Sequence, residues 1–377
     1  MTSSLGRRTG TVLAAALALS LLGAPTPSAA QTAGGDPGAV VAATPVAPDA
    51  RPPGVADATY VTYWTTGPMD EPALSTGAVL LPPGAAPPGG WPVVSWAHGT
   101  VGIADKCAPT VTGKLVGPYV QHWLDQGYAV VATDYVGLGT PGVHPYLDGP
   151  TEAHSVIDMV RAARTVTPSL SNRWVALGQS QGGHAALVAA SMATTYAPEL
   201  DFRGTVATGA PSNLENLAPL VGPGFPQLPL TGSTVFVAYA LAGLRASRPD
   251  LDIDSYLTPL GVDVLNRVES LCYEEAAPQL DGISIGQLMS RPLDDPAVLA
   301  ALRITLGVPV RGYDRPLFIG QGLFDDVVPI PLTWKLTADL AANGQQFVFR
   351  TYPTGHLYTM PASLPDTSAF VRSLFGW

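Results

Sequence analysis

Charged side chains are scarce in this chain of 377 residues. Asp, Glu, Lys and Arg together make up 13% of it, and the formal net charge at pH 7 is −10. Basic residues form no stripe along the sequence, which argues against a nucleic-acid-binding protein. We find no internal repeat. Two cysteines without a supporting histidine cluster do not make a zinc site, so no metal is expected.

A hydrophobic run long enough to span a membrane is also missing. The apolar stretch from Val12 to Leu22 is too short for a bilayer. It follows the basic pair Arg7 and Arg8 and precedes small residues that end at Ala30, a pattern typical of a signal peptide over residues 1–30. The residues after the arginine pair do not resemble a twin-arginine signal, which favours the general secretory route. We therefore expect a secreted protein, cleaved near the end of this segment, with no transmembrane segment in the mature chain.

Cysteine is the rarest of the chemically informative residues, with only Cys107 and Cys272 present. In the oxidising compartment that an export signal implies, two such residues are expected to form a disulfide. The alternative is a pair of separate buried thiols. A disulfide would join a loop in the first half of the chain to a later insertion.

The rest of the chain divides by pattern into a leader, a core and an insertion. Residues 31–53 are rich in Ala, Pro, Gly and Val with little periodicity, which predicts a flexible leader. Strand and helix patterns alternate over 54–211 and again over 313–377, an order typical of a mostly parallel sheet with helices on both faces. Residues 212–312 show mainly helical patterns, and we interpret them as a helical cap inserted into this α/β core.

The expected helices of the cap and of the C-terminus can be stated by residue range. Apolar spacing predicts cap helices over 235–246, 262–275 and 295–304. The last expected strand covers 346–352, and a closing helix is expected over 363–375. This arrangement leaves His356 in a loop between them.

A serine between two glycines carries the strongest functional signal. The segment Gly178–Gly183, with the sequence GQSQGG, follows a buried-strand pattern and precedes an alanine-rich helical pattern. At a strand-to-helix turn, GxSxG is typical of the nucleophile elbow of α/β-hydrolases, in which small neighbours permit a sharp turn. Ser180 is therefore the expected nucleophile. The alternative is an ordinary turn in which this serine caps the helix.

Two loops downstream supply the partners that a serine nucleophile needs. A serine hydroxyl requires a base within hydrogen-bond reach, and the base requires an acid that orients it. In α/β-hydrolases the chain order is serine, acid, histidine. His356 follows the last expected strand and is the expected base. Asp325 and Asp326 follow the preceding strand; we favour Asp325 for its distance from the strand end and keep its neighbour as the alternative.

An oxyanion hole needs two N–H donors aimed at the reacting carbonyl oxygen. The residue after the nucleophile, Gln181, is expected to supply one from its backbone, and the loop over 98–102 the other. Within that loop we favour Thr100. The alternative is that 98–102, with the sequence HGTVG, is an ordinary flexible turn.

Taken together, these landmarks resemble secreted α/β-hydrolases of the secretory lipase family, of the actinobacterial type. The matching motifs are WAHGT at 96–100, CAP at 107–109, DYVGLGT at 134–140, GQSQGG at 178–183, ALAGL at 240–244 and GH at 355–356. The resemblance covers nearly the whole mature chain. It implies an α/β-hydrolase fold, hydrolysis of carboxylic esters, acyl chains held under the helical cap, and no cofactor.

Carried over residue by residue, the resemblance implies a triad of Ser180, Asp325 and His356, with Thr100 and Gln181 at the oxyanion positions. Family members often have a smaller residue after the serine. The side chain of Gln181 is therefore expected to narrow the pocket.

The resulting hypothesis is a secreted lipase or esterase that forms an acyl-enzyme on Ser180. Its expected partners are small-molecule ester or lipid substrates and, transiently, a lipid interface. One alternative is a prolyl-type serine peptidase, which shares the doubled glycine after the elbow, although too little chain precedes Pro92 for the extra domain usual in that class. The other alternative is a non-catalytic binding protein on a hydrolase scaffold.

Overall fold

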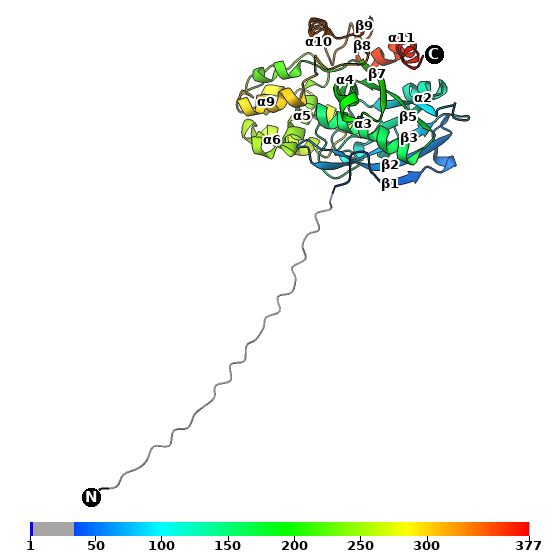
Figure 1. The fold of residues 1–377 in the computed structure, drawn as a ribbon. Coiled ribbons are helices and arrows are strands. Elements are labelled where there is room, and N and C mark those ends of the chain that lie inside the picture. Colours follow the sequence, from blue (N-terminus) through cyan, green and yellow to red (C-terminus); the bar gives the residue numbers. More distant parts are fainter. Residues whose placement is uncertain (3–33, 377) are drawn as a thin grey trace. The chain divides into compact units, whose positions relative to one another are not determined.

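The computed structural model describes residues 1–2 and 34–376, and the fold of 34–376 is built on one nine-stranded sheet (Figure 1). The strands lie in the order β1-β2-β3-β5-β4-β6-β7-β8-β9. The expected signal peptide over 1–30 falls almost entirely on residues outside those described. None of the described helices is both long and apolar enough to cross a membrane.

Most of the sheet is parallel, as the alternating pattern predicted. The antiparallel edge consists of β1 (Val40–Pro45), β2 (Asp57–Thr66) and β3 (Pro72–Leu81), and β3 is also antiparallel to β5 (Ala129–Thr133). The parallel strands that continue from β5 are β4 (Trp91–Ala97), β6 (Leu170–Gln179), β7 (Asp201–Thr208), β8 (Leu317–Gly322) and β9 (Phe347–Tyr352). Their carboxyl ends therefore meet at one edge of the sheet, where α/β proteins place their sites.

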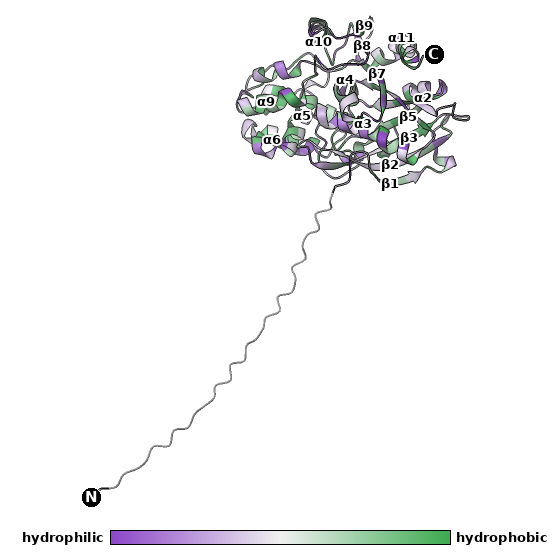
Figure 2. Cartoon of the chain, in the orientation of Figure 1, coloured by the Kyte–Doolittle hydropathy of each residue, from purple (hydrophilic) through white to green (hydrophobic). Residues whose placement is uncertain are grey.

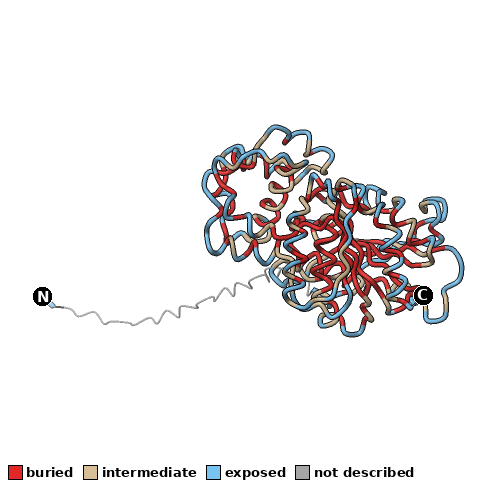
Figure 3. The backbone as a smooth tube through the Cα atoms, turned by 90° about the horizontal axis from the view of Figure 1, so that it is seen from above, coloured by how far each residue is buried: buried red, intermediate tan, exposed pale blue. Residues whose placement is uncertain are grey.

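Helices cover both faces of this sheet. One face packs against α3 (Gly149–Val166), α4 (Gln181–Tyr196) and α10 (Ile330–Ala342), and the other against α2 (Pro118–Asp125) and α11 (His356–Phe375). Successive strand side chains point to opposite faces, so Val93 of β4 joins the first core and Val94 the second. Burial on both faces explains why the central strands read as continuous apolar runs. Figure 3 shows this dense buried centre.

The cap lies between β7 and β8, and its helices pack around an apolar cluster that Ile103, Tyr146 and Leu147 of the core also join. Its helices are α5 (Ser233–Ser247), α6 (Pro259–Val268), α7 (Tyr273–Ala276), α8 (Ile285–Leu288) and α9 (Pro296–Thr305). Figure 2 shows hydrophobic stretches in α5 and α9. The expected helix over 262–275 is in fact two, α6 and α7. Cys272 separates them because it is extended and acts as the N-cap of α7, forming a capping box with Glu275.

Shorter elements complete the chain. They are α1 (Pro109–Thr112) and the 3-10 helices η1 (Pro48–Ala50), η2 (Asp105–Cys107), η3 (Leu214–Asn216), η4 (Ala218–Leu220), η5 (Pro249–Leu251), η6 (Ile253–Tyr256) and η7 (Ala277–Gln279).

The predicted disulfide is confirmed. Cys107 and Cys272 are bonded, with their Cα atoms 5.4 Å apart, so the alternative of two separate thiols is wrong. The bond joins the end of η2 in the core to the start of α7 in the cap. Beside it, Lys114 pairs with Glu274 across the same junction at 3.1 Å. The cap is thus tied covalently to the core near its own midpoint.

The N-terminal leader is more ordered than the sequence suggested. The prediction of a flexible leader over 31–53 is wrong for β1, which pairs antiparallel with β2. Five of the six β1 residues are exposed, so the strand needs no alternation of apolar and polar residues and shows none. The strand forms because the edge of β2 offers backbone groups that another strand can pair with.

The closing helix is longer than predicted and begins at His356 instead of Ser363. Pro361 and Pro365 argued for a late start, because proline lacks the N–H that a helix interior uses. Both prolines lie on the exposed side of α11, while the opposite side is buried against the sheet. Tertiary packing therefore outweighs the lost hydrogen bonds, and His356 occupies the first turn of a helix rather than a loop.

Candidate active site

Ser180 lies at a strained turn between β6 and α4. Its backbone angles are φ 57° and ψ −124°, a conformation that non-glycine residues rarely adopt. The two glycines of the motif make this turn sterically feasible. A Cβ on Gly178 would lie 2.0 Å from the carbonyl oxygen of Gly182, and a Cβ on Gly182 would lie 1.9 Å from that of Ala97. The sequence GQSQGG therefore produces the sharp elbow expected of it.

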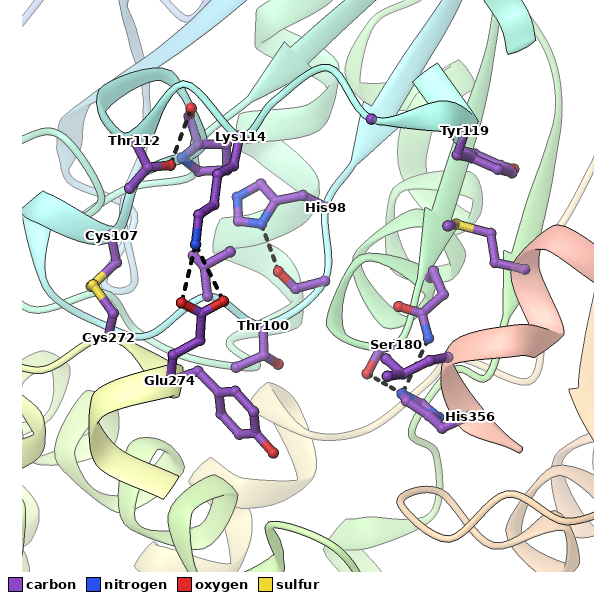
Figure 4. A pocket seen from close by; sticks show the side chains of 18 of the residues that line it. His98, Thr100, Cys107, Thr112, Lys114, Tyr119, Ser180, Cys272, Glu274 and His356 are labelled. Atoms are coloured by element: carbon purple, nitrogen blue, oxygen red, sulfur yellow. Dashed lines mark hydrogen bonds and ion pairs between the residues drawn. A yellow bond between two sulfur atoms is a disulfide. The ribbon is translucent and has the colours of Figure 1, made fainter. Parts of the chain in front are cut away.

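Three side chains from separate elements meet at this elbow. The Ser180 Oγ lies 2.9 Å from Nε2 of His356, and the histidine Nδ1 lies 2.8 Å from Oδ2 of Asp325. Because the carboxylate accepts a hydrogen bond from Nδ1–H, Nε2 is left free to accept the serine proton. His356 is almost completely buried, at 5% exposure, so bulk water competes little for these bonds. Figure 4 shows Ser180 and His356 facing each other at the pocket.

The structure distinguishes the two neighbouring carboxylates. Asp325 is buried, and its Oδ1 accepts hydrogen bonds from the backbone N–H groups of Val327 (3.0 Å) and Val328 (2.7 Å). Asp326 is exposed, and its Oδ2 accepts a hydrogen bond from the Thr231 hydroxyl. Only Asp325 reaches the imidazole.

One residue that supports Asp325 was not predicted from the sequence. Gln321, in β8, is fully buried and donates its amide N–H to Oδ2 of Asp325 at 2.9 Å. Its amide oxygen accepts a hydrogen bond from the Thr333 hydroxyl. A glutamine in an otherwise apolar strand was the available signal, because a buried amide must find partners.

Of the two expected oxyanion positions, Gln181 directly follows Ser180 and Thr100 lines the same pocket as Ser180. Gln181 is the first residue of α4, where a backbone N–H has no partner within the helix. Thr100 lies in the loop after β4, and its hydroxyl is 2.7 Å from the Tyr146 hydroxyl. A Cβ on the preceding Gly99 would lie 3.7 Å from the Cβ of Ser180, so this loop passes beside the nucleophile.

The side chain of Gln181 does not narrow the pocket as expected. It is 1% exposed and points into the protein, where its amide nitrogen lies 2.7 Å from Oε1 of Glu152. The glutamine on the other side of the nucleophile, Gln179, lines the pocket instead. Its amide nitrogen is 3.2 Å from Nε2 of His356. Sequence reasoning missed this contact, because the motif leaves the residue before the serine unspecified.

A cavity of about 670 Å³ opens over Ser180 and His356. Both the core and the cap line it: the core supplies Trp96, Leu115, Tyr119, Val120, Leu357 and Met360, and the cap supplies Phe236 and Tyr273. The two cap rings stack with centroids 5.4 Å apart. Among the described residues, no group of three or more His, Cys, Asp or Glu side chains is arranged to hold a metal ion. The pocket thus combines a largely apolar wall with the Ser180 hydroxyl.

Several proteins with similar sequences are named as lipases. A family model described as secretory lipase matches residues 108–375. Lipase A of Moesziomyces aphidis is 26% identical over 344 residues, which cover 83% of this chain and 71% of that protein. A secreted triacylglycerol lipase of Malassezia globosa is 27% identical over 270 residues, which cover 67% of this chain and 54% of that protein. A protein of Mycobacterium tuberculosis named a probable inactive lipase is 25% identical over 342 residues, covering 84% and 73%.

Solved structures share the fold. Candida antarctica lipase A superposes with a TM-score of 0.74 at 21% identity, covering 90% of this chain and 82% of that one. The rice cell wall degrading esterase LipA of Xanthomonas oryzae superposes with a TM-score of 0.71 at 21% identity, covering 89% of this chain and 98% of that one. These likenesses confirm the predicted α/β-hydrolase fold.

The family model covers most of the chain, including the segments that carry Ser180, Asp325 and His356. The resemblance seen in the short motifs is therefore confirmed over a continuous stretch. The chain belongs to the secretory lipase family and is an ester-cleaving hydrolase.

Proposed function

We propose that this protein is a secreted lipase or esterase that hydrolyses carboxylic esters through an acyl-enzyme on Ser180. The observation that carries the proposal is the continuous line of hydrogen bonds from Ser180 through His356 to Asp325. A hydroxyl on a strained turn, a buried imidazole and a buried carboxylate are the groups that acyl transfer requires in this order.

In the proposed mechanism, Nε2 of His356 takes the Ser180 proton as Oγ attacks the ester carbonyl carbon. Asp325 stabilises the imidazolium that forms, and the backbone N–H of Gln181, together with Thr100, stabilises the oxyanion. The imidazolium then gives its proton to the departing alcohol, which leaves the acyl group on the serine. A water molecule, deprotonated by the same imidazole, attacks this ester and releases the acid.

The substrate class follows from the pocket wall. Tyr119, Leu357 and Met360 offer apolar surface beside the nucleophile, which suits an acyl chain better than a peptide. Beside Asp325 and His356 in the sequence, Phe324 is 70% exposed, Leu357 75% and Tyr358 71%. Exposed apolar side chains around a pocket mouth favour transient contact with a lipid interface. Export through a signal peptide over residues 1–30, cleaved near Ala30, and the disulfide fit the same extracellular setting.

The experiment that tests the proposal compares two serine variants of the same helix region. Ser180→Ala is expected to lower kcat on p-nitrophenyl esters by about 10⁴-fold or more, with the melting temperature retained. Ser191→Ala removes a hydroxyl in α4 that donates to the carbonyl of Val188, and is expected to leave turnover unchanged. Normal turnover by folded Ser180→Ala would remove this serine from the mechanism.

The same assay separates the alternatives. A relative named a probable inactive lipase keeps the non-catalytic protein as an outcome. Absence of turnover in the folded wild-type protein on all esters would favour it. Release of p-nitroaniline from peptide substrates without ester turnover would favour a peptidase.

A further inference from the structure

A buried carboxylate lies beneath the nucleophile elbow and takes no part in the proposed proton transfers. Glu152, in the first turn of α3, is fully buried. Its Oε1 accepts hydrogen bonds from the side-chain amide of Gln181 at 2.7 Å and from the backbone N–H of Leu147 at 3.0 Å. A buried carboxylate is costly unless it is paired, so these two contacts are strongly held.

The Gln181 side chain can adopt only one orientation in this setting. Its amide nitrogen also lies 2.7 Å from Nε2 of His144, whose Nδ1 lies 2.8 Å from the carbonyl oxygen of Val136. That carbonyl requires a proton on Nδ1, which leaves Nε2 as an acceptor. Both N–H bonds of the amide are therefore committed, one to His144 and one to Glu152. A flipped amide would place its oxygen against two acceptors.

The second expected oxyanion residue, Thr100, is connected to the same carboxylate, Glu152, through residues 135–147. Tyr146 shares a hydrogen bond with the Thr100 hydroxyl at 2.7 Å, and Tyr135 donates one to the carbonyl oxygen of His98 at 2.9 Å. The ring of Tyr135 stacks on that of His144 with an interplanar angle of 15°. This segment is joined to Glu152 through the backbone of Leu147, which follows Tyr146 directly.

We propose that Glu152 is a positioning residue for oxyanion stabilisation. It fixes Gln181 through the side-chain amide and fixes the loop of Thr100 through Leu147 and Tyr146. The two donor positions, which come from chain segments about 80 residues apart, are thereby held by one buried group. Oxyanion donors act only when they are preorganised at hydrogen-bond distance from the developing charge, so a small displacement lowers the rate. This inference rests on the proposed function.

The test is Glu152→Gln, with Asp158→Asn as the matched control. The glutamine keeps the size of the side chain and an acceptor oxygen for Gln181 and Leu147, but removes the charge that strengthens both hydrogen bonds. Asp158 is also a buried carboxylate of α3, but its partners are Thr65, Tyr196 and the guanidinium of Arg161, away from the elbow. Both variants therefore remove a buried charge from one helix.

Two readouts distinguish positioning from general loss of structure. The first is kcat and KM on a soluble p-nitrophenyl ester, and the second is the inhibition constant of an alkylboronic acid, which forms a tetrahedral adduct on a reactive serine. We expect Glu152→Gln to lower kcat about 10- to 100-fold, with KM within twofold, and to weaken boronic acid binding by the same factor. Asp158→Asn is expected to leave kcat and the boronic acid inhibition constant within twofold of wild type.

Equal changes in kcat and in boronic acid affinity for Glu152→Gln and Asp158→Asn would overturn the proposal. If Glu152→Gln does not fold, Tyr146→Phe decides, because it removes only the hydrogen bond to Thr100. A loss of about threefold or more in kcat, matched in boronic acid affinity, supports the proposal, and unchanged values contradict it. If the wild-type protein neither turns over esters nor binds the boronic acid, the proposed function itself fails, and this inference fails with it.

Discussion

Asp325 and Asp326 are adjacent in the sequence but have opposite surroundings. The first is buried and bonded to an imidazole, an amide and two backbone N–H groups, whereas the second is exposed and bonded to Thr231. Hydrogen bonds to the buried carboxylate oxygens fix the direction in which this group points. At the scale of single residues, the surroundings rather than the side-chain chemistry decide which carboxylate can act.

A pair of isosteric variants tests this difference. Asp325→Asn is expected to lower kcat by about 10⁴-fold, because an amide facing Nδ1 favours the wrong tautomer of His356. Asp326→Asn is expected to leave kcat within threefold. Steady-state kinetics on one soluble ester, with melting temperatures as the folding control, checks both. Comparable losses in the two variants would show that the acid had been assigned wrongly.

Some residue positions could be predicted from the sequence and others could not. The order rule for parallel strand ends was sufficient to place Ser180, Asp325 and His356 together, because all three follow strands whose carboxyl ends share one edge. Gln321 and Glu152 were not predicted. Their partners come from distant segments, so no local pattern reveals them.

At the scale of elements, the N-terminus of α3 carries an unusual cap. Asp148 is the N-cap of this helix, and its side chain accepts a hydrogen bond from the backbone N–H of Thr151. Burial raises the pKa of Asp148 to about 6, although the hydrogen bonds from Thr151 act in the opposite direction. The folded protein therefore holds this proton more tightly than the unfolded chain does.

This pKa predicts how one variant changes stability with pH. A carboxyl whose folded pKa is raised stabilises the fold below its unfolded pKa, near 4, and loses that contribution as pH rises through about 6. Asp148→Asn keeps an oxygen acceptor for the cap but cannot ionise. Its stability relative to wild type is expected to rise by roughly 2 kcal/mol between pH 4 and pH 7.

Urea unfolding of wild type and Asp148→Asn across this pH range measures the effect. Asp326→Asn serves as the control, since that carboxylate is exposed. A stability difference between wild type and Asp148→Asn that does not change with pH would contradict the raised pKa.

Elements were predicted well where their pattern is set by burial and poorly where it is not. The central strands are buried on both faces, so their apolar runs identified them. Strand β1 is exposed and depends on the edge of β2, which its own sequence does not encode. Helix α11 begins before two prolines, because packing of its buried face outweighs their local preference.

At the scale of the whole molecule, the cap and the core are crosslinked by one disulfide, and Ile103, Tyr146 and Leu147 of the core pack into the apolar cluster of the cap. The disulfide between Cys107 and Cys272 closes a loop with a sequence separation of 165. The pocket lies at this junction, since Cys107, Cys272 and Tyr273 all line it. Fixing the cap at this point therefore fixes part of the substrate pocket.

Removal of this bond is expected to destabilise the protein substantially. For a loop of this length the chain-entropy model gives a stabilisation of about 5 kcal/mol, which is an upper figure. The variant Cys107→Ala/Cys272→Ala is expected to melt well below wild type. Adding a reductant should lower the melting temperature of wild type toward that of the variant and leave the variant unchanged. Equal melting temperatures of wild type and the variant would contradict a stabilising role.

The central claim is that Ser180 is already activated by His356 in the free protein. Its most direct measurement is reaction with a fluorophosphonate, followed by intact mass and peptide mapping. A single adduct on Ser180 is expected, with labelling slowed at least about 100-fold in folded His356→Ala. Folded wild-type protein that takes up no label, or takes it up on another serine, would contradict the account.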